Sequence, residues 1–259
     1  MTIPPARSRR RFLTTALTAT LGAGMGATAL TACGAEQRGR AGGSAPPTRP
    51  TTPSLQVAEG NGTLVADGNE ALRLLMEGNQ RFVADQAQHE DEGAERRGAV
   101  STAQHPFATV LGCIDSRVPA EFVFDRGLGD LVVVRSAGGV LDRSVTGSLE
   151  FGVAELGTPL LLVLGHQRCG AIDATIKAVD AKKSHQEGEI GYLVEALAPA
   201  VRQAAGTPGD RLANAVHANV GLVLAQLRKS PVLGPLEKDG KVKLVGAYYE
   251  LDTGKVLVS

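Results

Sequence analysis

Three short runs of apolar residues stand out in the central part of the chain. They cover Phe107–Gly112, Leu131–Val134 and Leu160–Leu164, and each is bounded by residues typical of turns. Unbroken apolar runs of this length are typical of strands that are buried on both faces of a parallel sheet. The pattern therefore predicts a parallel sheet at the centre of the fold.

Helical periodicity separates these runs. Apolar residues recur at helical spacing in Asn69–Ala84, which predicts an amphipathic helix that packs against the main body. A charged stretch, His89–Gly98, is predicted to be a loop, and Asp252–Gly254 gives a hairpin signal between two strand-like segments. Further helices are predicted at Ser144–Leu156, Ala171–Ala181, Tyr192–Ala205 and Ala213–Lys229.

Strands and helices that alternate in this way predict an α/β fold. We expect a mostly parallel central β-sheet flanked by helices, with a C-terminal antiparallel edge strand and an N-terminal helical arm. The sequence shows no internal repeat.

The N-terminal residues indicate a targeting signal. Ser8–Leu13 holds consecutive arginines in a twin-arginine pattern, and small or apolar uncharged residues follow from Thr14 to Ala32. This segment is weakly hydrophobic, so a signal-peptide core is favoured over a membrane span. A disordered basic tail is the alternative.

Leu30–Cys33 resembles the lipobox of bacterial lipoproteins, which predicts that Cys33 is lipidated; cleavage at the small residues Ala27–Ala29 is the alternative. We predict a signal peptide over 1–33, a flexible tether rich in Gly, Pro and Thr over 34–67, and a folded domain over 68–259. The expected location after twin-arginine export is the outer face of the cytoplasmic membrane. Without the lipid, the expected location is the periplasm or the exterior.

Composition removes several classes of function. The 27 basic and 27 acidic residues balance, so no nucleic-acid footprint is indicated. Aromatic residues make up only 3% and Trp is absent, which argues against stacking platforms for single strands. With only 3 cysteines, a disulfide framework is also disfavoured. We expect no nucleic-acid partner, and contact with a membrane only through a lipid on Cys33.

Candidate chemistry follows the ends of two predicted strands. The first strand runs into Cys113, and the third into His166 and Cys169. Ligands of open parallel sheets bind beyond the carboxyl ends of the strands, so these side chains fall where a site is expected. Cysteine sulfur and histidine nitrogen are preferred ligands of zinc, and three of them leave a fourth position open for water. Taken singly, Cys113 is as well explained by a buried thiol, and His-x-x-Cys is a weak signal.

Together the two clusters are specific. Cys113–Arg117 and His166–Cys169 resemble the Cys-x-Asp-x-Arg and His-x-x-Cys signature of the β-class carbonic anhydrases, and the resemblance continues from Ala71–Val83 to Gly254. It implies that Cys113, His166 and Cys169 bind Zn²⁺. It also implies that Arg117 grips Asp115 and keeps this carboxylate from becoming a fourth ligand. Gly170 would offer its backbone N–H to the oxygens of the substrate.

The resemblance implies reversible hydration of carbon dioxide to bicarbonate by attack of zinc-bound hydroxide. Because two thiolates reduce the charge of the ion, we expect hydration to strengthen as the pH rises above neutrality. Two alternatives stay open: a carbon disulfide or carbonyl sulfide hydrolase on the same fold, and a non-catalytic zinc-binding lipoprotein. A thiol phosphatase is disfavoured. The spacing of Cys113 and Arg117 is too short for the phosphate loop that a thiol phosphatase needs.

The chain also departs from the family pattern. Ser136 and Gly139 stand where many relatives have Asn, and Arg126 stands near the place of a Gln that contacts substrate, which puts in doubt how the oxygens are held. Val110 occupies the place of a Trp that a second, inhibitory bicarbonate site requires, so that regulation is not expected. By resemblance we expect a homodimer or a higher even-numbered homo-oligomer. The remaining histidines are expected to be structural or exposed, namely His89, His105, His185 and His217.

Overall fold

The computed structural model describes residues 59–60, 63–182 and 188–259, and of residues 59, 60, 63 and 64 only the backbone. All described residues belong to one compact unit. The predicted signal peptide and Cys33 lie outside the described residues, as does most of the predicted tether. His185 also lies outside them.

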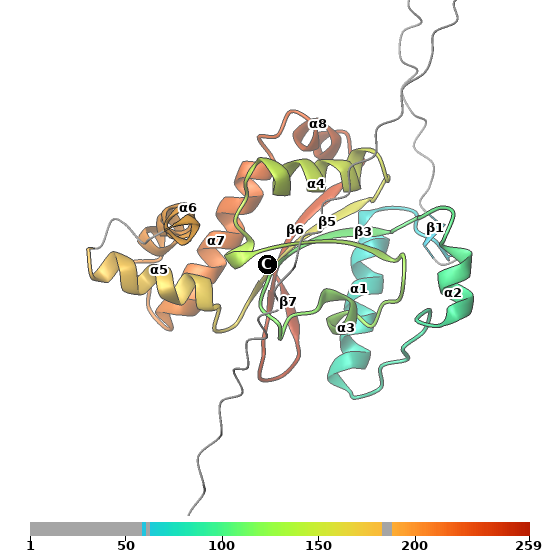
Figure 1. The fold of residues 1–259 in the computed structure, drawn as a ribbon, viewed down its shortest axis with the longest axis horizontal. Helices are drawn as coiled ribbons and strands as arrows, with labels where there is room; N and C mark the ends of the chain where they lie inside the picture. Colours follow the sequence, from blue (N-terminus) through green and yellow to red (C-terminus); the bar gives the residue numbers. More distant parts are fainter. Residues whose placement is uncertain (1–58, 61–62, 183–187) are drawn as a thin grey trace, which may run out of the picture. The chain divides into compact units, whose positions relative to one another are not determined.

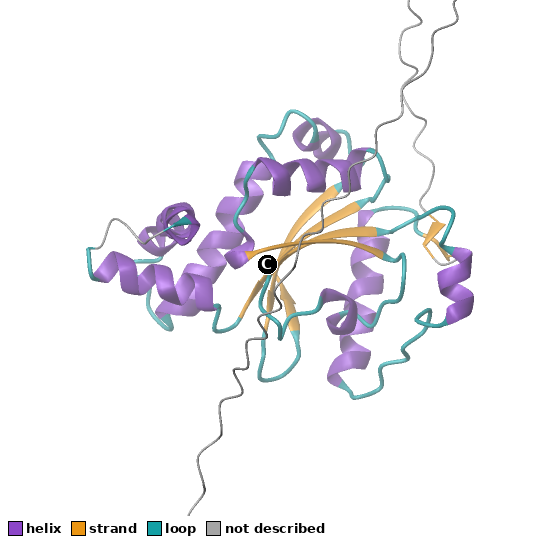
Figure 2. Ribbon diagram, viewed as in Figure 1, coloured by secondary structure: helices purple, strands orange, loops and turns teal. Residues whose placement is uncertain are grey.

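A single mixed sheet forms the centre of this unit (Figure 2). Its order is β4-β3-β5-β6-β7, with parallel pairing throughout except between β6 and β7, which are antiparallel. The predicted parallel sheet with a C-terminal antiparallel edge strand is thus confirmed. The strands are β3 (Ala108–Cys113), β4 (Leu131–Ser136), β5 (Leu160–His166), β6 (Lys243–Tyr249) and β7 (Val256–Val258).

The long helices fall where the periodicity predicts them, and the short ones were missed. Helix α2 occupies the second half of His89–Gly98, so the prediction of a loop there was wrong. Among the helices of the described residues, none has the length and hydrophobicity of a membrane span. The helices are α1 (Gly68–Val83), α2 (Ala94–Ala99), α3 (Ala120–Val123), the 3₁₀ turn η1 (Ala137–Gly139), α4 (Arg143–Ala154), α5 (Gly170–Asp180), α6 (Glu189–Gln203), α7 (Arg211–Leu227) and α8 (Leu233–Lys238).

Two further strands, β1 (Glu59–Gly60) and β2 (Thr63–Leu64), form a short antiparallel pair inside the segment predicted as a tether.

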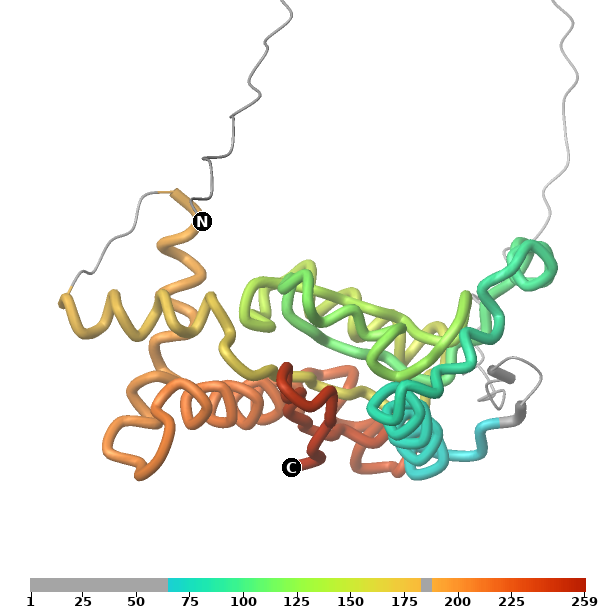
Figure 3. Tube along the Cα trace, turned by 90° about the horizontal axis from the view of Figure 1, so that it is seen from below, coloured from blue at the N-terminus to red at the C-terminus, as the bar shows by residue number. Residues whose placement is uncertain are grey.

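Strand β5 shows why the sheet is buried on both faces. Leu160, Leu162 and Leu164 pack into a cluster with residues of α1 and α3. Leu161 and Val163 point to the other face and join residues of α4, α7 and α8. Side chains of a strand alternate between faces, so an unbroken apolar run supplies both cores. Figure 1 and the rotated view in Figure 3 show α5 and α6 together at one end of the unit, away from α1 and α3.

Strand β4 differs from the expectation of burial on both faces. Leu131–Val134 are only half-buried, whereas all residues of β3 are buried. The reason is position, because β4 is the edge strand and pairs with β3 alone among the described strands.

Helix α1 is fastened to the body by one buried amide. Asn79 donates from Nδ2 to the carbonyl oxygens of Val123 (3.0 Å) and Gly254 (2.8 Å), and its Oδ1 accepts from the Val256 amide (2.9 Å). A buried amide is stabilising only when its groups are paired, as they are here. The N-terminal helix is thereby tied to α3 and to the β6–β7 hairpin.

Candidate metal centre

Two neighbouring strands, β3 and β5, place the first two candidate ligands at the same end of the sheet. Cys113 is the last residue of β3 and His166 is the last residue of β5. These strands pair in parallel, so their carboxyl ends meet. Cys169 follows as the N-cap residue of α5. The ligand atoms of the three residues all lie within 4.8 Å of one another, and all three residues are buried.

The imidazole of His166 is oriented for binding a cation. Its Nδ1 lies 3.0 Å from the Gln167 carbonyl oxygen, which can only accept, so Nδ1 carries the proton. Nε2 then has a free lone pair, and it is buried without a hydrogen-bond partner among the described residues. A buried nitrogen with a free lone pair beside two sulfurs fits the ligand set of a cation.

The two thiols also require a cation if both are to ionise. A hydrogen bond with the Cys169 thiol holds the pKa of Cys113 well below its usual range, and the Gly138 amide adds to this from 3.3 Å. The same contact with Cys113, together with burial, raises the pKa of Cys169. One sulfur therefore ionises at the expense of the other. The donor set of two sulfurs and one imidazole nitrogen is the one that zinc prefers.

Asp115 and Arg117 form a bidentate pair beside the ligands. Arg117 donates from Nε to Oδ1 (2.9 Å) and from Nη2 to Oδ2 (2.7 Å), and its amide also donates to Oδ1 (3.0 Å). These contacts hold the pKa of Asp115 far below its usual range, despite partial burial. Oδ2 lies 4.0 Å from Nε2 of His166, so the carboxylate adjoins the ligand group without belonging to it.

Contacts that sequence reasoning missed come from β4 and the turn after it. Arg135 donates from Nε to the Cys113 carbonyl (2.8 Å) and from Nη2 to the Asp115 carbonyl (2.6 Å). Gly138, with a φ of +67°, places its amide on the Cys113 sulfur, and its carbonyl accepts from the buried Asn219 (2.8 Å). Nothing in the spacing of Arg135 and Gly138 along the sequence predicts these contacts.

The remaining predicted positions separate into two groups. Gly170 opens α5 next to Cys169, is exposed, and has open space where a Cβ would lie. Gly139 is buried but also has open space where a Cβ would lie. The Ser136 hydroxyl donates to the Val140 carbonyl (2.8 Å). Arg126 lies elsewhere: it donates to the Leu74 carbonyl of α1 and stacks over Phe107 at 5.3 Å. Within its own chain, Arg126 has no hydrogen bond or ion pair with the candidate ligands among the described residues.

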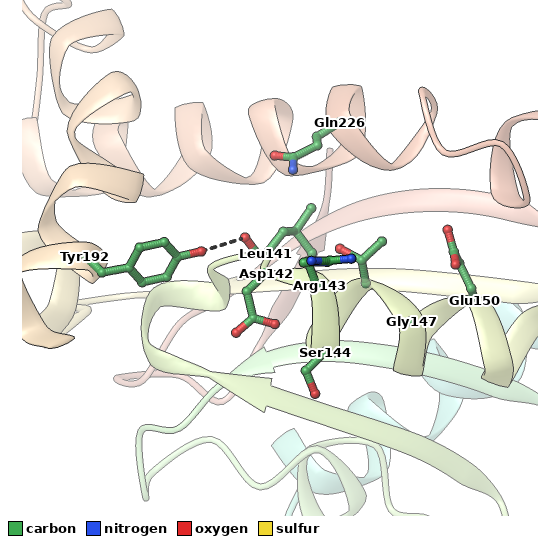
Figure 4. Close-up of a pocket in the computed structure, with 9 residues that line it drawn as sticks. Leu141, Asp142, Arg143, Ser144, Gly147, Glu150, Tyr192 and Gln226 are labelled. Atoms are coloured by element: carbon green, nitrogen blue, oxygen red, sulfur yellow. Dashed lines mark hydrogen bonds between the residues drawn. The ribbon is translucent and has the colours of Figure 1, made fainter.

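A surface hollow of about 830 Å³ is separate from these ligands. It lies at the start of α4, where Tyr192 of α6 donates to the Leu141 carbonyl (3.4 Å) and Gln226 of α7 faces it (Figure 4). None of Cys113, His166 and Cys169 lines it. The candidate metal ligands therefore lie at the carboxyl ends of β3 and β5 and not in this hollow.

Comparison with known proteins agrees with the ligand geometry. Residues 108–256 match the family model described as carbonic anhydrase, which is more than half of the chain. The chain belongs to the carbonic anhydrase family. It is 42% identical over 194 residues to a carbonic anhydrase of Mycolicibacterium smegmatis, covering 72% of this chain and 90% of that protein. It is 38% identical over 192 residues to carbonic anhydrase 2 of Mycobacterium tuberculosis H37Rv, covering 73% and 91%.

Solved structures of carbonic anhydrases of the β class share the fold. The β-carbonic anhydrase CcaA has a TM-score of 0.58 at 23% identity, covering 72% of this chain and 94% of that one. A structure from a study of two tetrameric β-carbonic anhydrases of Sordaria macrospora has a TM-score of 0.57 at 17% identity, covering 72% and 95%. The chain is thus a carbonic anhydrase with the fold of the β class, an enzyme of reversible carbon dioxide hydration.

Proposed function

We propose that Cys113, His166 and Cys169 hold a zinc ion that serves the reversible hydration of carbon dioxide. The observation that carries this proposal is Nε2 of His166, which is buried beside two buried thiols and has no hydrogen-bond partner in the described part of the chain. When bound, zinc supplies a Lewis acid that makes water nucleophilic near neutral pH. Three protein ligands leave a coordination position for solvent, which is the arrangement of catalytic rather than structural zinc sites.

Asp115 would keep that position open. Both of its oxygens are occupied by Arg117, so the carboxylate acts as a fixed hydrogen-bond acceptor beside the ion and not as a ligand. A storage site would gain from a fourth protein ligand, so this arrangement argues against a non-catalytic zinc carrier.

Gly170 would orient the substrate. Its backbone N–H is in the first turn of α5, where N–H groups have no partner within the helix and the helix dipole is positive. The open space at its Cα leaves room for a small molecule with partial negative charge on oxygen, such as carbon dioxide or bicarbonate.

The full chain can be tested by metal analysis together with stopped-flow hydration. We expect about one zinc per chain and carbon dioxide turnover, and His166→Ala should lose both. His217→Ala is a matched control, since His217 is an exposed histidine that stacks on Tyr248 at 4.5 Å. Purified chain without zinc would refute the proposal. Zinc with turnover of carbon disulfide but not carbon dioxide would point to the hydrolase alternative.

We also propose that the chain is exported by the twin-arginine route and anchored by a lipid on Cys33. The support is the arginine pattern in Ser8–Leu13 and the lipobox-like Leu30–Cys33. Radiolabelled palmitate should be incorporated into the wild type and not into Cys33→Ser. Replacing Arg9 and Arg10 together by Lys should retain the precursor inside the cell, and labelled or exported protein in these variants would contradict the proposal.

A homo-oligomer is the assembly that we propose. The edge strand β4 is half-buried, and a shallow hollow along it is lined by Val132, Val133 and Val134 with Phe151 of α4, which is 55% exposed. Polar side chains, including Arg135 and Arg143, also line the hollow, and exposed apolar groups with a polar rim beside an edge strand suit contact with another chain. The relative from Sordaria macrospora, described as tetrameric, agrees with this. Light scattering after size exclusion should give a multiple of the mass of the chain, and a monomer would contradict the proposal.

A further inference from the structure

The side chains of the two residues between His166 and Cys169 both donate hydrogen bonds to one carboxylate that is distant in the sequence. Gln167 donates from Nε2 to Oδ2 of Asp252 (3.0 Å), and Arg168 donates to both oxygens, at 2.8 Å and 2.6 Å. The Asp252 amide donates back to Oε1 of Gln167 (3.2 Å). A residue in the β6–β7 hairpin thus holds the turn that lies between two candidate ligands.

This turn needs to be held from outside. Arg168 has a φ of +53°, in the left-handed region that is strained for a residue other than glycine. Such a conformation persists where surrounding contacts determine it. Two contacts determine it here. The Asp252 carboxylate accepts from the Arg168 side chain, and the backbone N–H of Gln167 donates to the Tyr249 carbonyl (2.8 Å).

The turn also reaches the Asp115–Arg117 pair. The Arg168 carbonyl accepts from Nη2 of Arg117 at 3.4 Å, which is the nitrogen that also binds Oδ2 of Asp115. The direction of the Arg168 peptide therefore bears on where Cys169 lies and on where Arg117 holds Asp115. A change at Asp252 would be transmitted to both.

We propose that Asp252 is a positioning residue of the metal centre. It fixes the Gln167–Arg168 turn so that Nε2 of His166 and Sγ of Cys169 converge, while touching neither metal nor substrate. The inference rests on the proposed zinc function of these ligands. An exposed ion pair contributes little to global stability, and the Arg168 and Asp252 side chains are 50% and 61% exposed. The effect is therefore expected in zinc affinity and ligand geometry, not in unfolding.

The test compares Asp252→Ala with Asp180→Ala in the full chain. Asp180 forms a similarly exposed bidentate pair with Arg211, at 2.8 Å to each oxygen. Asp180 is the last residue of α5, at the opposite end of this helix from Cys169, and Arg211 is the first residue of α7. Zinc affinity is measured by competition with a chromophoric chelator, and ligand geometry by the visible absorption of the cobalt-substituted protein. Asp252→Ala should weaken zinc affinity by about tenfold and alter the cobalt spectrum, as changes behind metal ligands do. Asp180→Ala should change neither.

Two further variants keep the test decisive. Asp252→Asn keeps one acceptor oxygen, so its zinc affinity should lie between those of the wild type and Asp252→Ala. If Asp252→Ala fails to fold, Asp252→Asn takes its place in the test. Adding Arg168→Gly to Asp252→Ala removes the backbone strain and should recover part of the affinity. Wild-type affinity and spectrum in Asp252→Ala, or equal losses in Asp180→Ala, would overturn the inference while leaving the zinc site standing. A wild-type chain that binds no zinc would overturn the proposed function and this inference with it.

Discussion

Asp115 shows how much one side chain depends on its neighbour. The carboxylate is 14% exposed and lies 4.0 Å from the ligand nitrogen of His166, close enough to approach a bound cation if it were released. Arg117 occupies both oxygens, and a guanidinium is the only side chain with the planar fork that does so. In the proposed zinc site, the pair would decide whether the fourth position is open to solvent.

Replacing Arg117 by Ala should close the site without emptying it. The freed Asp115 carboxylate would take the position that solvent needs, so we expect zinc to be retained and carbon dioxide hydration to fall by roughly 100-fold. Stopped-flow rates and zinc content measured on the same preparation check this. Arg117→Lys should fall between, since an ammonium cannot bind both oxygens. Full activity in Arg117→Ala would show that Asp115 needs no restraint.

Asp125 predicts a pH-dependent contribution to stability. Burial raises the pKa of this carboxyl, but Arg81 (2.5 Å to Oδ2) and the amides of Gln88 and His89 outweigh it, so the folded-state pKa is lowered. A lowered pKa stabilises the fold above the unfolded value, about 4, and this contribution is lost as the pH falls through the folded value.

Asp125→Asn should therefore lower the free energy of unfolding by about 2 kcal/mol at neutral pH. The difference from the wild type should shrink as the pH falls below about 4, because the Asp125 carboxyl is protonated first in the unfolded chain and then, at lower pH, in the folded protein. Urea unfolding at a series of pH values measures it. A difference that stays constant with pH would contradict the assignment.

At the residue scale, the sequence predicted the ligands but not what surrounds them. Cys113, His166 and Cys169 could be found because each follows a recognisable strand and together they match a known spacing. The contacts of Arg135 with the Cys113 carbonyl and of Asp252 with the Arg168 side chain depend on strand register and on how hairpins lie in space. Neither is encoded in local spacing.

Close packing between elements depends on glycines at a few positions. A Cβ at Gly78 of α1 would lie 1.7 Å from the Phe124 carbonyl oxygen, so α1 can approach α3 only without a side chain there. Gly221 of α7, by contrast, has open space at the same position. Packing therefore requires glycine at position 78 and does not require it at position 221.

Gly78→Ala should destabilise the fold by about 3 kcal/mol, because backbone must move to admit the methyl group. Gly221→Ala should stabilise it by up to about 1 kcal/mol, since alanine has the higher helix propensity. Denaturant midpoints of the two variants measured against the wild type check both signs. Equal effects would mean that propensity, not the α1–α3 contact, governs Gly78.

At the element scale, long periodic segments could be predicted and short ones could not. The apolar run of β5 and the helical spacing of α7 extend over enough residues to fix their type. Helices α2, α3 and α8 have six, four and six residues, too few for a period to show. The edge position of β4 was also beyond prediction, since strand order comes from tertiary packing.

The whole unit should respond to its metal. An ion bound by the ends of β3 and β5 and by the start of α5 would add a link to the pairing of the two strands, and ligand binding to the folded state alone raises stability. Removal of zinc with a chelator should lower the melting temperature by roughly 5–15 °C, and added zinc should restore it.

Calorimetry or circular dichroism measures this shift. Cys113→Ser should melt like the metal-free wild type and should not respond to zinc, whereas Cys33→Ser should respond as the wild type does. A wild-type melting temperature unaffected by chelation would count against a tightly bound ion.

The neighbouring strands that end in Cys113 and His166 are far apart along the chain, with β4 and α4 between them. During synthesis the first sulfur therefore leaves the ribosome well ahead of its partners, and a nascent chain has no complete chelate to offer. Parallel pairing over such a separation is among the slower steps of folding. If the three residues bind zinc as proposed, metal uptake would be a late event, and only molecules that have finished folding would carry the ion.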